Sequence, residues 1–137
     1  MICRADLVSE IRNTDPRFEP IVEQFLKEWS NEADEGALPE YLLFAEISRV
    51  IAEDIRTGNR APLPKIFAMI ERLHIDGDDH VREAATVGLL EDIQTQLLLS
   101  NTGWHLAHPY LGSESKRWWD KLFLLWNAGQ YDALHED

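Results

Sequence analysis

The chain has one cysteine, Cys3, and no long apolar run. A lone cysteine excludes an internal disulfide and a zinc site built on several cysteines. The longest apolar runs, such as residues 122–126, fall far short of the roughly 20 residues that a membrane-spanning helix needs. Charges interrupt the amino-terminal segment where a secretory signal would need an apolar core. We therefore expect a cytoplasmic protein without a membrane segment.

Basic residues are also scarce, with 13 Lys and Arg against 25 Asp and Glu, for a net charge of −12. The excess of acid is concentrated in residues 15–40 and 76–92. Negative surfaces repel phosphate backbones and anionic lipids, which argues against nucleic-acid and membrane partners. The same charge speeds encounter with a basic protein. The alternative is that the acidic helix faces only keep the protein soluble.

Motifs typical of catalysis are missing from the sequence. The glycines are isolated and form no phosphate-binding loop, and no G-x-S-x-G or S-x-x-K pattern marks a nucleophile. Carboxylates at adjacent helical positions, such as Glu53 and Asp54, point about 100° apart and seldom converge on one substrate. The sequence therefore predicts a protein that is not an enzyme and that holds no cofactor.

Five histidines raise the question of a metal site. His105 and His108, three residues apart, could supply two ligands from one face of a short helix, with a third from His74, His80 or Asp120. The spacing matches no zinc signature, and histidines beside aromatic residues usually serve packing and hydrogen bonding. We therefore predict no metal.

Residues 76–79 contain alternating carboxylates that resemble the start of a calcium-binding loop. Val81 occupies the position that such a loop reserves for glycine, and Val87 replaces its bidentate glutamate. The pattern instead favours a helix cap at Asp78 or Asp79.

Apolar residues recur at three- and four-residue steps along most of the chain, and no stretch alternates with the period of a strand. With 137 residues, 45% of them apolar, the sequence predicts one all-α domain, residues 1–137, forming a compact bundle of about six helices. Its tail, residues 130–137, is expected to be flexible. The expected helices are 3–13, 18–29, 38–57, 62–76, 78–100 and one from Ser113 or Ser115 to 129, with a loop at 31–36 and an irregular stretch at 104–112.

The helix expected at residues 78–100 organises the rest of the bundle. Its apolar stripe is widened by Leu98 and Leu99, which implies packing on two sides. Ala84, Ala85 and Gly88 lie one turn apart, so a neighbouring helix can approach closely there. The helices at 18–29 and 38–57 also carry wide stripes, which place Ile21, Leu42 and Val50 in the core.

The last helix carries the adjacent pair Trp118 and Trp119. Two adjacent rings cannot both be buried against one neighbour, so one is expected to be partly exposed, and exposed tryptophans are enriched at binding hot spots. The alternative is that both rings anchor the helix on the bundle. Lys116, Arg117 and Lys121 make this helix locally basic.

Two resemblances accompany these patterns. The run Asp78-Asp79-His80-Val81-Arg82-Glu83-Ala84-Ala85, followed by Leu89, resembles the second half of a HEAT-type helical repeat, which implies a HEAT-like helix pair. The run Val87 to Gln94, with Tyr110-Leu111-Gly112 and Trp118-Trp119, resembles a group of small all-helical bacterial proteins without assigned activity. Some proteins similar to that group are immunity proteins that neutralise a toxin by binding it.

Together, the charge and the resemblance predict a protein-binding inhibitor, an immunity protein that covers a basic toxin such as a nuclease. The alternative is a helical adaptor or oligomerising scaffold that binds a peptide, or a second copy of itself, through an aromatic groove. The residues predicted to bind the partner are Glu23, Glu28, Asp78, Asp79, Trp118 and Trp119.

Overall fold

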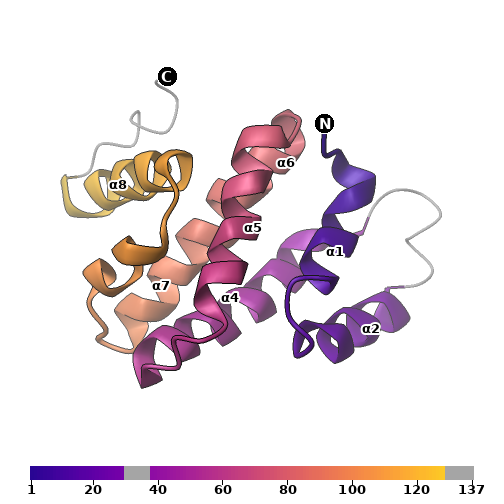
Figure 1. The fold of residues 1–137 in the computed structure, drawn as a ribbon, viewed down its shortest axis with the longest axis horizontal. Helices are drawn as coiled ribbons and strands as arrows, with labels where there is room; N and C mark the ends of the chain where they lie inside the picture. Colours follow the sequence, from indigo (N-terminus) through magenta and orange to yellow (C-terminus); the bar gives the residue numbers. More distant parts are fainter. Residues whose placement is uncertain (30–37, 129–137) are drawn as a thin grey trace.

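The computed structural model describes residues 1–29 and 38–128, and every regular element in these ranges is helical (Figure 1). The helices are α1 (Arg4–Arg12), α2 (Phe18–Glu28), α4 (Glu40–Thr57), α5 (Leu63–Asp76), α6 (Asp79–Glu83), the π-helix η1 (Ala84–Leu90), α7 (Glu91–Leu99), the 3₁₀-helix η2 (Trp104–Tyr110) and α8 (Ser113–Ala128). The prediction of an all-α fold is confirmed. The loop expected at 31–36 and the tail at 130–137 lie outside the described residues.

Helix α4 and the continuous path formed by α6, η1 and α7 lie at the centre of the bundle. In Figure 1, α1 and α2 lie toward one end of the molecule, whereas α8 lies at the other. Helix α5 packs on both η1 and α8, so it joins the centre to the second end. None of the helices in the described ranges combines the length and apolarity that crossing a bilayer requires.

The middle of the expected 78–100 helix is a π-helix and not an α-helix. The N–H of Glu91 donates to the carbonyl of Thr86, five residues back, which defines the wider turn. Gly88 lies in this segment, directly against the ring of Phe44 from α4. A Cβ atom at Gly88 would lie 2.5 Å from Phe44 Cδ2. The predicted close approach is therefore confirmed, but the hydrophobic pattern does not reveal the change in helical turn.

Several residues expected in the core are exposed or only partly buried. Leu98 and Leu99 at the end of α7 are 60% and 76% exposed, and Leu42 near the start of α4 is 53% exposed. Ile21 and Val50 are partly buried. The apolar stripes of these helices are wider than the surface that neighbouring elements cover, so the stripe edges face solvent.

Several helix ends in the described part of the chain have identifiable caps. Gly58 follows α4 with a φ of +76°, a left-handed conformation that glycine adopts without strain. The Asp78 carboxylate accepts the N–H of Val81 at 2.9 Å and caps α6, as predicted. At α8 the expected serine cap is replaced by Glu71 of α5, whose carboxylate accepts the backbone N–H groups of Glu114 and Ser115 at 3.1 and 2.8 Å.

The Glu71 cap requires an open space at Gly112. A Cβ there would lie 2.3 Å from the Glu71 carboxyl carbon, so only glycine admits this close approach. Burial raises the pKa of Glu71, but the hydrogen bonds from Ser115 and Glu114 outweigh it, and the net pKa lies below the ordinary value. The carboxylate therefore remains charged and also complements the positive end of the α8 dipole.

A buried imidazole joins α5, η1 and α8. His74 is 3% exposed, and its Nδ1 lies 3.0 Å from the Ile70 carbonyl oxygen and 3.3 Å from Ser115 Oγ. Its Nε2 lies 2.9 Å from Thr86 Oγ1 in the π-helix. Because the carbonyl can only accept, Nδ1 carries the proton. The Thr86 hydroxyl lies within hydrogen-bond distance of both Nε2 and the Arg82 carbonyl. Desolvation lowers the pKa of His74 below its ordinary value, which keeps the ring neutral.

Candidate functional site

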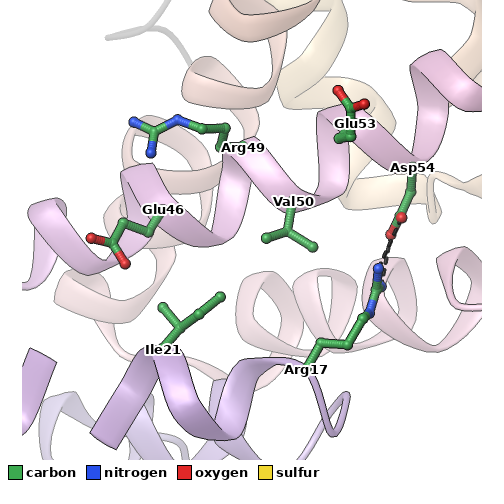
Figure 2. Close-up of a pocket in the computed structure, with 7 residues that line it drawn as sticks. All are labelled: Arg17, Ile21, Glu46, Arg49, Val50, Glu53 and Asp54. Carbon is green, nitrogen blue, oxygen red and sulfur yellow. Dashed lines mark hydrogen bonds and ion pairs between the residues drawn. The ribbon is translucent and has the colours of Figure 1, made fainter. Parts of the chain in front are cut away.

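A groove of about 460 Å³ runs between α2 and α4 (Figure 2). Its floor is apolar, because Val50 of α4 points toward Ile21 of α2 across the gap. Glu46 lies over one end of this floor, and Arg49 and Glu53 extend along the rim from α4. Glu46, Val50 and Glu53 follow each other at four- and three-residue steps, so they share one face of the helix.

An ion-pair network closes the other end of the groove. The Arg17 guanidinium donates from both terminal nitrogens to the Asp54 carboxylate, at 2.9 and 2.8 Å. The same guanidinium donates to Asp15, and Asn59 donates to Asp54 at 3.1 Å. Both carboxylates are more than nine-tenths buried, so the bidentate pair fixes the spacing of α2 and α4.

The pKa values follow from this geometry. The hydrogen bond from Arg17 lowers the pKa of Asp15 below its ordinary value, against the opposing effect of burial. The hydrogen bond to Asp54, and to a lesser extent the one to Asp15, raises the pKa of Arg17 above its ordinary value. One guanidinium thus serves two carboxylates, and the three groups together carry a net charge of −1.

The rim of the groove presents charge to solvent. Glu53 pairs with Arg56, and both side chains are about half exposed. Glu46 and Arg49 are also exposed, and no residue in the described ranges forms an ion pair with either. The Arg49 charge acts on Asp92 of α7 and opposes the rise that burial produces in the pKa of that carboxyl. Glu46 is thus the rim carboxylate with the fewest protein contacts.

The two acids predicted on α2 have different environments. Glu23 pairs with Arg12 of α1, which also lies 3.4 Å from Glu19, so part of this acidic surface is neutralised within the chain. Glu28, at the end of α2, is exposed, and no ion pair joins it to another described residue. Of this predicted pair, Glu28 is the better placed to meet a partner.

The predicted acids at the start of α6 also differ. Asp78 caps the helix, and this hydrogen bond occupies one of its oxygens. The Asp79 side chain is 98% exposed and pairs with Arg82 one turn later. Farther along, Glu91 and Asp92 are half-buried, and burial raises the pKa of each.

The two adjacent tryptophans differ in exposure, as their positions in the sequence predict. Trp119 is 1% exposed and packs edge-to-face on Trp104, with ring centroids 6.2 Å apart. Trp118 is partly exposed, and the charged ends of Arg117 and Lys121 lie 4.9 and 4.7 Å from its ring centroid. The expectation that one ring is partly exposed is confirmed, and that ring is Trp118.

The six predicted binding residues belong to three separate elements. Glu23 and Glu28 lie on α2, Asp78 and Asp79 lie at the start of α6, and the tryptophans lie on α8 at the opposite end of the bundle from α2 (Figure 1). Helix α1 contacts both α2 and α6 and lies between the two acidic elements. The fold therefore presents several distinct surfaces and does not gather these residues into one site.

The histidines predicted as possible metal ligands have different neighbours. His108 Nε2 lies 3.3 Å from the Asp120 carboxylate of α8, whereas His105 lines a hollow beside the end of α4. His74 is engaged with Thr86, and His80 lies 3.5 Å from Glu40. Within residues 1–29 and 38–128, no three His, Cys, Asp or Glu side chains are grouped so that they could hold a metal ion.

The groove between α2 and α4 is the feature that sequence reasoning missed. The hydrophobic stripes assigned Ile21 and Val50 to the core, because both residues follow helical periodicity. A signal was nevertheless present: charged residues on both sides of Val50, at Glu46, Arg49 and Glu53, mark it as the edge of the stripe.

The sequence profile of the family described as "Domain of unknown function (DUF7674)" matches residues 8–127. The chain belongs to this family. The DUF7674 match runs from within α1 into α8, so the groove between α2 and α4 lies inside it. Neither a curated protein nor a solved structure matches the chain.

Proposed function

We propose that this DUF7674 protein acts by binding another protein, and that the α2–α4 groove holds a basic, amphipathic segment of the partner. The observation that carries the proposal is the apolar floor formed by Ile21 and Val50, with the exposed carboxylates Glu46 and Glu53 on the α4 side of the groove. An apolar anchor in such a groove contributes affinity, and charges at the rim contribute specificity and association rate.

The charge of the whole chain favours a basic partner. A net charge of −12 attracts a cationic protein over distances of about a Debye length, roughly 10 Å at 0.1 M salt. At contact, Glu46 is the carboxylate best placed to pair with a lysine or arginine, because no described residue forms an ion pair with it. Arg49 at the same rim adds selectivity, since a uniformly basic segment would be repelled there.

We favour inhibition of a toxin as the biological role of this binding. The sequence resemblance to proteins related to toxin immunity proteins and the acidic surfaces both support it. In this proposal, exposed Glu28 and Asp79 lie outside the groove and guide the basic toxin toward it. Binding by the chain would then cover the toxin's active surface.

A second candidate is an adaptor that binds a peptide or a second copy of the chain at the α8 surface. The partly exposed Trp118 favours it, because tryptophans are enriched at binding hot spots. Under this alternative, Trp118→Ala weakens binding, and substitution of the groove acids has little effect.

The experiment begins with the protein encoded by the neighbouring reading frame. Isothermal titration calorimetry measures its affinity for the wild-type chain and for the double variant Glu46→Gln/Glu53→Gln. We expect the variant to bind about tenfold more weakly, because two ion pairs at an exposed rim contribute roughly 1.4 kcal/mol together. A growth assay with the two genes expressed together tests whether binding neutralises toxicity.

A matched control variant distinguishes the effect of the groove carboxylates on affinity from the effect of the net charge. The variant Asp76→Asn/Glu83→Gln removes the same number of charges from exposed positions outside the groove. It should bind within about threefold of the wild type if the groove holds the partner, since distant exposed charges contribute little at contact. Equal weakening by both double variants would show that only the overall charge matters and would refute the groove.

A further inference from the structure

A second hollow, of about 560 Å³, lies where α4 ends, between the turn at residues 57–63 and η2. The α2–α4 groove and this hollow share Asp54, but otherwise they have different walls. Its apolar lining comes from the end of α4, the turn and η2 and consists of Ile55, Leu63, Leu106, Pro109 and Tyr110.

Gly58 and Tyr110 form two walls of this hollow. Gly58 ends α4 in a left-handed conformation, and an added Cβ would meet no atom within 4 Å, so the backbone borders open space. On the opposite side, the Tyr110 ring stacks on Phe67 with centroids 6.0 Å apart and an interplanar angle of 25°. Because Phe67 is fully buried, the tyrosine wall is fixed from behind.

This hollow contains an exposed cationic group in a chain that is acidic overall. Arg60 and His105 line it, and no described residue forms an ion pair or a side-chain hydrogen bond with the Arg60 guanidinium. The one carboxylate in the lining, Asp54, is engaged in the bidentate pair with Arg17, which also pairs with Asp15. The hollow therefore offers one available guanidinium beside apolar walls.

We propose that this hollow is a binding site for a small aromatic carboxylate. The apolar walls would cover the ring, and the Arg60 guanidinium would donate two hydrogen bonds to the carboxylate. A monoanion fits better than a phosphate dianion, because the other arginine in the lining, Arg56, is already held by Glu53. Imidazole N–H donation from His105 supplies a further contact at the rim.

Phenylacetate is the probe, and two-dimensional ¹H–¹⁵N NMR of the full chain is the measurement. Saturable shift changes confined to Gly58, Arg60, His105 and Leu106 are expected. Acetate, which lacks the ring, and 2-phenylethanol, which lacks the charge, should each bind at least about tenfold more weakly. Equal binding of the neutral alcohol, or shifts spread over the whole chain, would overturn the proposal.

A pair of arginine variants localises the site. Arg60→Gln should weaken phenylacetate binding about tenfold, since it removes the charged donor. Arg49→Gln removes another exposed arginine, which lines the α2–α4 groove and not this hollow, so it should leave the affinity unchanged. Equal effects of the two substitutions, or no saturable binding by the wild type, would refute the site. Because the variants alter different cavities, this result is independent of the protein-binding proposal.

Discussion

His74 makes the stability of the protein sensitive to pH. Its pKa lies below the ordinary value of 6.5, because burial disfavours the charged ring, although Glu71 and Glu114 partly oppose this. In the unfolded chain the ring returns to its ordinary pKa, so below that pH the unfolded state binds more protons. The contribution of His74 to the unfolding free energy should therefore be fully present above pH 6.5 and should be lost as the pH falls below that value.

Urea denaturation between pH 7 and pH 5 measures this effect, and His74→Gln is the matched variant. Glutamine retains hydrogen-bonding capacity but does not titrate, so its unfolding free energy should change less over this interval. Glu91 and Asp92 have raised pKa values and act in the opposite direction, because the stability that each contributes below its ordinary pKa of 4.5 or 3.8 is lost as the pH rises through its raised folded-state pKa. Wild type and variant share this contribution. Equal pH dependence of wild type and variant would contradict the role assigned to His74.

The tryptophan pair provides a second test at the scale of single residues. Trp119→Ala removes a buried ring that packs on Trp104 and should destabilise the protein by about 3–5 kcal/mol. Trp118→Ala removes a partly exposed ring and its cation contacts, at a cost of about 1 kcal/mol. Urea denaturation of both variants gives the difference. Similar losses would mean that the two rings are equally buried.

Between elements, the contact of Gly88 with Phe44 determines how closely the π-helix approaches α4. Replacing glycine by alanine in an exposed helix usually gains about 1 kcal/mol. Here the new Cβ would meet a fully buried ring at 2.5 Å, so we expect Gly88→Ala to lose about 1–3 kcal/mol. Thermal and urea unfolding measure the loss, and exposed Val87→Ala, which should change stability by less than about 0.5 kcal/mol, is the control. A stabilised Gly88→Ala variant would contradict this packing.

The same elements show what the sequence can and cannot predict. Helix positions and the Asp78 cap follow from local patterns, and the structure confirms them. The Glu71 cap of α8 joins residues more than 40 positions apart, and no local pattern encodes it. The π-helix likewise depends on tertiary contacts. The groove was missed because periodicity shows which side of a helix is apolar but not how much of that side its neighbours cover.

For the molecule as a whole, charge has two distinct roles. Some acids stabilise the fold, as Asp15 and Asp54 do with Arg17 and as Glu71 does at α8. Others, such as Glu46 and Glu28, remain available on the surface. Composition alone gives the total of −12 and cannot separate these roles, because pairing depends on which helices become neighbours.

The affinity of the neighbouring gene product for the wild-type chain and for the Glu46→Gln/Glu53→Gln variant tests the central claim most directly. If a basic segment of the partner lies in the α2–α4 groove, calorimetry will show about tenfold weaker binding by the groove variant. The control variant Asp76→Asn/Glu83→Gln will remain close to the wild type. An unchanged affinity of the groove variant, with the partner still bound, would contradict the account.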